Sequence, residues 1–316
     1  MLSYYNMKLL FIGDLQFGRR NKTCNFELPN DIVELFNQSD ALFFNLETVL
    51  LSEQFEIDKY KLNDKDISIY TIGEDHVKYL KEKVHKPIFV STINNHTFDY
   101  NMEGYKNTLH ILDKYNYKFT VMKTYYIDDN FIYLNATDHW TIKKSNVKNY
   151  PENTKLWSDN CLLIDSYEQE KYTCNLMQYL HKIKGKRKLI MSIHWGKNFQ
   201  SDYNTGTTYL QSRYETFFKK LCDLGTDVVF GHGAHHIINK PYEMYNNKLI
   251  IYGLGDYMGD FKYINEYNTD KNMMVLFDTN SHSVENILLG GNYTSYKNTD
   301  EEKCKQSYII KTNMLL

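Results

Sequence analysis

The stretch Val228-Val229-Phe230-Gly231-His232-Gly233-Ala234-His235 sets two histidines directly after a run of apolar residues. A short apolar run is typical of a buried strand, and open α/β sheets bind their ligands just beyond the carboxyl ends of their strands. Gly231 and Gly233 allow a tight turn that points both imidazoles to the same side. His232 and His235 are therefore the strongest local metal-binding signal in this chain.

The same arrangement, an apolar run followed by a polar island, recurs at four other places. The islands are Gly13-Asp14, Asn45-Leu46-Glu47, Asn94-Asn95-His96 and His194-Trp195-Gly196. Each signal is weak alone, although a carboxylate such as Glu47 is costly to bury unless it is paired or metal-bound. Because Asp, Glu, Asn and His are residues that bind divalent metals, their recurrence predicts a dinuclear metal site at one edge of a sheet. Gly13 should let the backbone turn sharply where the first strand ends.

Strands and helices alternate along most of the chain. Strand-like runs occur at Leu9–Ile12, Ala41–Phe44, Ile88–Thr92, Phe131–Ala136, Cys161–Ile164, Leu189–Ile193, Asp227–Phe230 and Leu249–Tyr252. Helical spacing occurs at residues 31–36, 102–115 and 209–224. This alternation predicts an α/β fold built from βαβ units around a largely parallel central sheet. We expect a single domain over residues 1–316, in which residues 272–316 form a β-rich edge and a tail.

Composition argues against several classes of protein. The chain carries 39 acidic and 37 basic residues, a net charge of −2, so electrostatics predicts no nucleic-acid partner. Five cysteines without a C-x-x-C spacing argue against a disulfide framework and a zinc knot, and favour a reducing, cytoplasmic compartment. No run approaches the roughly 18 apolar residues of a membrane span, so we expect no transmembrane anchor.

Six sequence blocks resemble the CapA, or poly-γ-glutamate capsule-synthesis, family, a branch of the calcineurin-like metallophosphoesterase superfamily. They come in the family's order over about residues 8 to 261. The blocks are Gly13-Asp14-Leu15-Gln16-Phe17-Gly18-Arg19, Asn45-Leu46-Glu47-Thr48, Asn94-Asn95-His96-Thr97-Phe98-Asp99-Tyr100, His194-Trp195-Gly196, Gly231-His232-Gly233-Ala234-His235 and Ile251-Tyr252-Gly253-Leu254-Gly255-Asp256-Tyr257. The resemblance implies a four-layer α/β/β/α sandwich with two divalent metals, and mixed nitrogen and oxygen ligands suit Mn, Fe or Zn.

The resemblance also implies a role for each site residue. Asp14 and His235 would hold one metal, Asn95, His194 and His232 would hold the other, and Glu47 would bridge them. The catalytic group would consist of His96, which faces the leaving oxygen of the substrate, with Asp99 from the same block and Arg19. An arginine can also grip a phosphate or carboxylate through two parallel hydrogen bonds, although Arg19 can equally be an ordinary surface residue.

Three positions depart from the family pattern. Gln16 stands where the superfamily often has a histidine, which predicts a poorer shell for one metal. Asn198 replaces a glutamate that usually follows His-Trp-Gly, and Asp256 replaces the asparagine of Leu-Gly-Asn-Phe. We expect Asp256 to act at the metals in place of the lost carboxylate; unrelated drift is the alternative.

These features predict a metal-dependent hydrolase, of phosphoesterase type, that acts on a phosphorylated or polyanionic substrate in capsule or cell-surface polymer biosynthesis. The alternative is a non-catalytic accessory protein of a poly-γ-glutamate synthesis complex with a structural metal site. Family members tied to that polymer are commonly membrane-anchored, so the expected lack of an anchor favours a soluble enzyme. A third hypothesis, a sugar-binding module, is supported only by the 28 tyrosines. Nothing in the sequence predicts the oligomeric state or separates monoester, diester and amide substrates.

Overall fold

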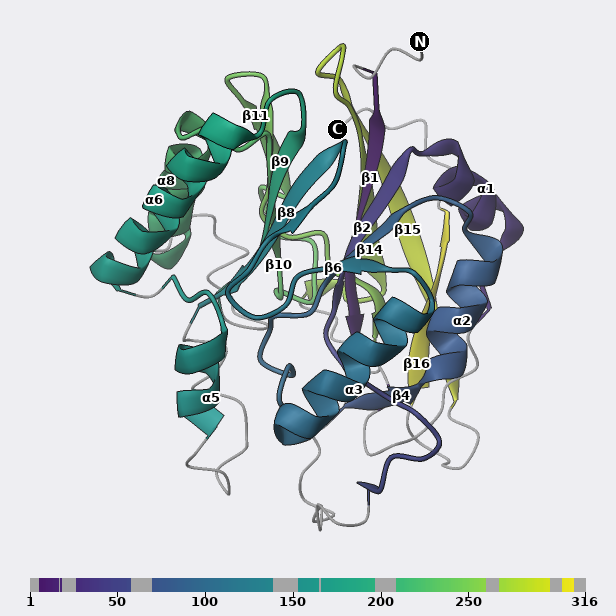
Figure 1. The fold of residues 1–316 in the computed structure, drawn as a ribbon. Helices are drawn as coiled ribbons and strands as arrows, with labels where there is room; N and C mark the ends of the chain where they lie inside the picture. The colour runs from purple at the N-terminus through teal and green to yellow at the C-terminus, as the bar shows by residue number, and fades with distance from the viewer. Residues whose placement is uncertain are drawn as a thin grey trace.

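Two β-sheets lie face to face between two groups of helices in the computed structural model, which describes residues 6–16, 18, 27–57, 70–138, 153–164, 166–196, 209–259, 267–295 and 303–309 (Figure 1). The α/β class predicted from the sequence is confirmed. The expectation of one central sheet is wrong, because the strands divide into two large sheets and one small one. A local apolar pattern identifies strands but does not state which strands pair.

The first sheet has the order β16-β15-β14-β1-β2-β5-β6, with β13 also paired to β1. Strands β1, β2, β5, β6 and β13 run parallel, and β14, β15 and β16 continue the sheet in antiparallel fashion. Their bounds are β1 Lys8–Gln16, β2 Ala41–Leu46, β5 Ile88–Ser91, β6 Lys118–Phe119, β13 Asp256–Gly259, β14 Lys271–Asp278, β15 Val284–Ser295 and β16 Lys303–Ile309.

The second sheet has the order β11-β12-β10-β9-β8-β7, with four parallel strands in the middle and an antiparallel strand at each edge. Its strands are β7 Tyr126–Ile127, β8 Phe131–Thr137, β9 Lys188–His194, β10 Val228–His232, β11 Tyr242–Tyr245 and β12 Lys248–Ile251. A separate small sheet pairs β3 Val49–Leu51 with β4 Thr71–Gly73.

Helices cover the outer face of each sheet (Figure 1). Helices α1 Asn30–Gln38, α2 Glu74–Lys83 and α3 Asn101–Lys114 pack on the first sheet, and α6 Tyr167–Ile183 and α8 Tyr209–Asp223 pack on the second. Helix α5 spans Asn153–Asn160. The predicted helices at residues 31–36, 102–115 and 209–224 are confirmed as α1, α3 and α8, whereas α6 had not been identified. Its start is marked by a capping box in which Ser166 and Gln169 satisfy each other's backbone N–H groups. Among the described helices, none is long and apolar enough to cross a membrane.

Alternation along β1 explains why the strands read as unbroken apolar runs. Leu10 and Ile12 pack toward the helices, while Leu9 and Phe11 pack into the layer between the sheets. In that layer the rings of Phe11, Phe43 and Phe89 stack across adjacent strands at 4.8 and 4.7 Å. Aromatic pairs of this kind stabilise by about 0.5–1.5 kcal/mol beyond area burial. Large rings therefore hold the two sheets together.

Two local predictions are wrong. Cys161–Ile164 is not a strand: it makes only an isolated bridge, between Leu163 and Thr137, and its side chains instead fill two core clusters. A short apolar run does not distinguish a strand from another buried segment. Gly13 does not form a turn either, because β1 continues to Gln16. Glycine is needed there because an added Cβ would lie 1.6 Å from the carbonyl oxygen of Gly255.

Candidate metal centre

Parallel strands from both sheets bring the site residues to one edge of the molecule. Asp14 lies in β1 opposite Asn45 of β2, and His194 of β9 lies opposite His232 of β10. All four side chains are buried. Because parallel strands end at the same edge, residues 219 positions apart come together: the N–H of Gly233 donates to Asp14 Oδ2 at 3.0 Å.

One group of possible ligands consists of Asp14, His194 and His232, whose donor atoms lie within 4.8 Å of one another. His232 Nδ1 is 3.2 Å from His194 Nδ1 and 3.7 Å from Asp14 Oδ1. Ser192 Oγ lies 2.8 Å from His232 Nε2, so Nδ1 is the ring nitrogen turned to the group. Burial lowers the pKa of His232 to about 3 and, with neighbouring histidines, that of His194 well below its usual value. Both imidazoles are therefore neutral, as metal ligands must be.

A second group consists of Asp14, Glu47 and His235. His235 Nε2 lies 3.5 Å from Glu47 Oε1, and His235 Nδ1 lies 2.8 Å from Asp256 Oδ1. Burial alone lowers the pKa of His235, but the carboxylates of Asp256, Glu47 and Asp14 together raise it to about 10. Burial also raises the pKa of Asp14 to about 7 and that of Glu47 well above its usual value. These acids hold protons that a cation would displace.

Glu47 connects the two groups through its two oxygens. Oε1 faces His235, whereas Oε2 lies 3.9 Å from His194 Nδ1. The carboxylate is fully buried, and it follows the last residue of β2. Asp14 belongs to both groups and does the same, because Oδ1 lies 3.7 Å from His232 Nδ1 and Oδ2 lies 4.0 Å from His235 Nδ1. A carboxylate that presents a separate oxygen to each group has the geometry of a bridging ligand.

Amide side chains fix the carboxylates, a feature that sequence reasoning missed. Asn45 Nδ2 donates to Asp14 Oδ1 at 2.8 Å and to Glu47 Oε2 at 3.2 Å. Asn45 Oδ1 accepts from Asn94 Nδ2 at 3.1 Å. The sequence did place Asn45 in a polar island directly after an apolar run. Its position between two acids, however, depends on the pairing of β1 with β2.

The turn after β5 carries Asn95 and His96. His96 Nδ1 lies 2.8 Å from Asp99 Oδ2, and His96 Nε2 lies 4.0 Å from Glu47 Oε1. Tyr70 supports this pair: its backbone N–H donates to Asp99, and its ring packs against the imidazole edge-on at 4.6 Å. Asp99 therefore holds His96 with Nε2 toward the metal groups. Asn95 is buried, and its Oδ1 has no hydrogen-bond partner among the residues described.

Asp138 is a further buried residue that sequence reasoning missed. Its Oδ2 accepts from the N–H of Gly196 at 2.7 Å and from the hydroxyl of Tyr214 at 2.6 Å. It anchors the loop that follows His194. The signal existed, because Asp138 follows the apolar run Phe131–Ala136 in the same way that the other site residues follow theirs.

Gly233 is a turn glycine as expected, whereas the prediction of a turn at Gly231 is wrong because Gly231 lies within β10; both positions require glycine for a steric reason. Gly233 has a φ of +105°, and an added Cβ would lie 2.6 Å from Cε1 of His194. At Gly231 an added Cβ would lie 2.6 Å from Nε1 of Trp195. Both positions admit glycine alone because the histidine-bearing loops approach each other so closely.

The remaining predicted residues are placed as follows. Asp256 lies beside Asp14 in β13 and contacts the far nitrogen of His235, a position that suits a residue behind a ligand rather than a ligand. Arg19 and Asn198 lie outside the described residues.

The chemistry of the donor set fits divalent cations. Buried acids with raised pKa values lie beside neutral imidazoles, and His194 Nε2 has no hydrogen-bond partner within the described part of the chain.

Two facing sheets with a buried cluster of acids and histidines at one edge define an α/β protein with a candidate metal centre. Comparison with known proteins gives the family: the family described as "Bacterial capsule synthesis protein PGA_cap" matches residues 8–260, and the chain belongs to it.

Two curated relatives come from Bacillus. The chain is 25% identical over 268 residues to the PGA biosynthesis protein CapA of Bacillus subtilis, covering 79% of this chain and 62% of that protein. It is 22% identical over 275 residues to the capsule biosynthesis protein CapA of Bacillus anthracis, covering 80% of this chain and 60% of that protein. The chain thus matches about three fifths of the length of these relatives. A solved structure of a hypothetical protein from Thermus thermophilus aligns over 96% of this chain and 99% of its own with a TM-score of 0.46 and 10% identity.

Proposed function

We propose that this protein is a metal-dependent hydrolase of phosphoesterase type with a dinuclear metal site. The observation that carries the proposal is the position of Glu47, whose two oxygens face His235 on one side and His194 on the other. One cation would be held by Asp14, Glu47 and His235. The other would be held by Asp14, Glu47, His194 and His232, with the buried oxygen of Asn95 as a further donor.

The protein's own residues would perform the remaining steps. Bound divalent cations supply Lewis acidity, which neutralises phosphoryl oxygens and lowers the pKa of water. Asn45 holds Asp14 and Glu47 at a fixed separation, and Asp256 holds His235. Asp99 Oδ2 lies 2.8 Å from Nδ1 of His96 and directs Nε2 toward Glu47, where a proton on Nε2 would pass to the leaving oxygen of the substrate.

The family supports the biological role that we propose for this chain. Its members are capsule-synthesis proteins, and the two Bacillus relatives are named for biosynthesis of PGA and of capsule. We extend this role to the present chain as a link to cell-surface polymer biosynthesis, with a phosphorylated or polyanionic substrate.

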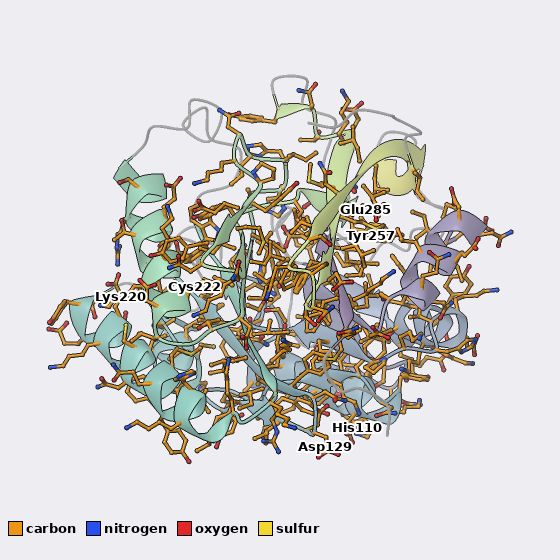
Figure 2. All side chains as sticks on the ribbon, turned by 90° about the horizontal axis from the view of Figure 1, so that it is seen from above. His110, Asp129, Lys220, Cys222, Tyr257 and Glu285 are labelled. Atoms are coloured by element: carbon orange, nitrogen blue, oxygen red, sulfur yellow. The ribbon has the colours of Figure 1, made fainter. Side chains whose placement is uncertain are left out.

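Elemental analysis of the purified protein, followed by turnover of a generic phosphodiester and phosphomonoester with added Mn²⁺, tests the proposal. We expect two metals per chain and turnover that falls by about 10²–10⁴-fold in His96→Ala, the range for loss of a general acid. His110→Ala is the matched control, because His110 lies on the exposed side of α3 at the margin of the molecule (Figure 2). It should leave turnover unchanged.

The accessory role is the competing outcome of the same experiment. Two bound metals with no turnover on a broad panel of phosphate esters and γ-glutamyl amides would favour a structural metal site. Absence of bound metal after reconstitution would contradict both roles. The His96–Asp99 pair favours chemistry, because a structural metal site needs no hydrogen-bonded histidine facing it from outside the ligand groups.

A further inference from the structure

Gln16 is a buried amide at the carboxyl end of β1. It is fully shielded from solvent, and its Nε2 donates to Glu47 Oε1 at 3.0 Å. The sequence alone predicted that this residue weakens the shell of one metal. The structure gives the residue a different position: it contacts the carboxylate that joins the two ligand groups.

The chemistry of the contact determines how the amide is oriented. The NH₂ group of Gln16 donates to Glu47 and its oxygen is turned from that contact, which is the orientation that a metal-bound Glu47 requires, because Glu47 is then ionised and can only accept. That oxygen, Oε1, is buried and has no hydrogen-bond partner among the residues the structure describes. Buried amide oxygens are nearly always satisfied, so an unsatisfied one beside a cluster of ligands calls for a missing partner such as an ion.

The contact also places Gln16 at one particular end of the site. The oxygen that it contacts, Glu47 Oε1, is the one that lies 3.5 Å from His235 Nε2. The other oxygen of Glu47 lies near His194. Gln16 therefore belongs with Asp14, Glu47 and His235, the group that contains a single nitrogen ligand among the residues that the structure describes.

We propose that Gln16 Oε1 is a ligand of the cation held by Asp14, Glu47 and His235, while Gln16 Nε2 orients Glu47; this inference rests on the proposed dinuclear site. A neutral amide oxygen adds a hard donor to two carboxylates and one imidazole. Oxygen-rich sets of this kind suit Mn²⁺ better than Zn²⁺. The chain therefore has one oxygen-rich position that prefers Mn²⁺ and one histidine-rich position.

Metal titration of the metal-free protein, with Mn²⁺ and with Zn²⁺, tests this assignment by calorimetry and elemental analysis. Gln16→Met removes the oxygen at nearly constant volume, and we expect the affinity for one of the two Mn²⁺ ions to fall at least tenfold. Gln16→Glu keeps an oxygen but cannot donate to Glu47, and it should bind that ion at least as tightly as the natural protein. Gln16→His should shift the same position toward Zn²⁺.

Thr226→Val is the matched control. Thr226 is fully buried and its hydroxyl also lacks a hydrogen-bond partner among the described residues, but it precedes β10 at the opposite end of the sheet. Its substitution should leave both metal affinities unchanged. Thermal melting in chelator shows whether each variant folds. If Gln16→Met does not fold, the metal affinity of Gln16→Glu alone tests the assignment.

The outcomes separate this inference from the proposed function. Two metals in the natural protein with unchanged Mn²⁺ affinity in Gln16→Met would overturn the ligand assignment and leave the dinuclear site standing. Equal losses in Gln16→Met and Gln16→Glu would also overturn it, because the hydrogen bond to Glu47 would then be the important feature. A natural protein that binds no metal would overturn both proposals.

Discussion

The two sheets contribute different chemistry to the same site. The first sheet provides the acids and amides, namely Asp14, Gln16, Asn45, Glu47 after β2, and Asp256 in β13. The second sheet provides the histidines His194 and His232, followed by His235. His96 comes from the first half of the chain, but it is paired with Asp99 and reaches the site only through Nε2.

The difference shows what burial does to each kind of group. On the first sheet burial raises the pKa values of Asp14 and Glu47, which favours their neutral forms. On the second sheet burial lowers the pKa of His232, which also favours its neutral form. The exception is His235, which carries charge because it faces carboxylates of the first sheet. The site is thus poised to exchange protons for cations where the sheets meet.

The largest expected effect comes from breaking the connection between the sheets at Glu47. Glu47→Gln keeps the shape of the side chain but removes the charge that both ligand groups share. Residues that only support a ligand contribute up to about 100-fold in metal affinity, so we expect the loss of this shared ligand to weaken binding of both metals by more than about 100-fold. Calorimetric titration measures this. Glu74→Gln is the control, because Glu74 pairs with Lys114 at the surface. Retention of both metals in Glu47→Gln would contradict the bridging role.

Proton competition should make metal binding strongly pH-dependent. Burial and neighbouring charges favour protons in the metal-free site on His235, with a pKa of about 10, on Asp14, with a pKa of about 7, and on Glu47, whose pKa is raised well above its usual value; the metal-bound site holds none of them. Affinity should therefore rise with pH, by at least about tenfold per pH unit below pH 10 and more steeply toward acid pH. Titrations at pH 6, 7 and 8 measure the slope. A flat profile would mean that the ligands are already deprotonated without metal.

Removing only the support behind His235 should have a smaller effect. Asp256→Asn retains the shape of the side chain but loses its charge. That charge favours a proton on Nδ1 of His235, so that Nε2 of His235 is available to the metal. The affinity for the metal held by His235 should therefore fall about 10–100-fold. Counting bound metal and measuring its dissociation constant test this. Unchanged occupancy and affinity would support unrelated drift at this position instead.

The smallest effect expected is steric, at the contact between the histidine-bearing loops. Gly233→Ala places a side chain on a left-handed residue and against the ring of His194, which should reduce the free energy of unfolding by about 1–3 kcal/mol. Gly185→Ala is the matched control, because Gly185 also has a positive φ but would place its Cβ in open space; it should lose only about 1 kcal/mol. Denaturant unfolding in chelator compares the two. Equal losses would mean that the contact with His194 is unimportant.

Much of the site was predictable because each ligand directly follows an apolar run. The runs at Leu9–Ile12 and Asp227–Phe230 predicted β1 and β10, and the residues after them predicted Asp14 and His232. Asn45 and Asp138 also follow such runs, but their roles depend on a neighbouring strand and a distant loop. The role of Gln16 could not be predicted in the same way, because it depends on the orientation of the amide, which only the contact with Glu47 reveals.

The sequence by itself determined the fold class, the strands and the set of residues that gather at one edge, because hydrophobic periodicity and polar breaks are local properties of the chain. The tertiary structure decided the rest. It assigns each strand to one of the two sheets, sets the acids of one sheet against the histidines of the other, and places Asp256 behind His235 and Gln16 against Glu47. Pairing, side-chain orientation and the burial that shifts each pKa are long-range properties, which arise only when segments far apart in the chain pack together.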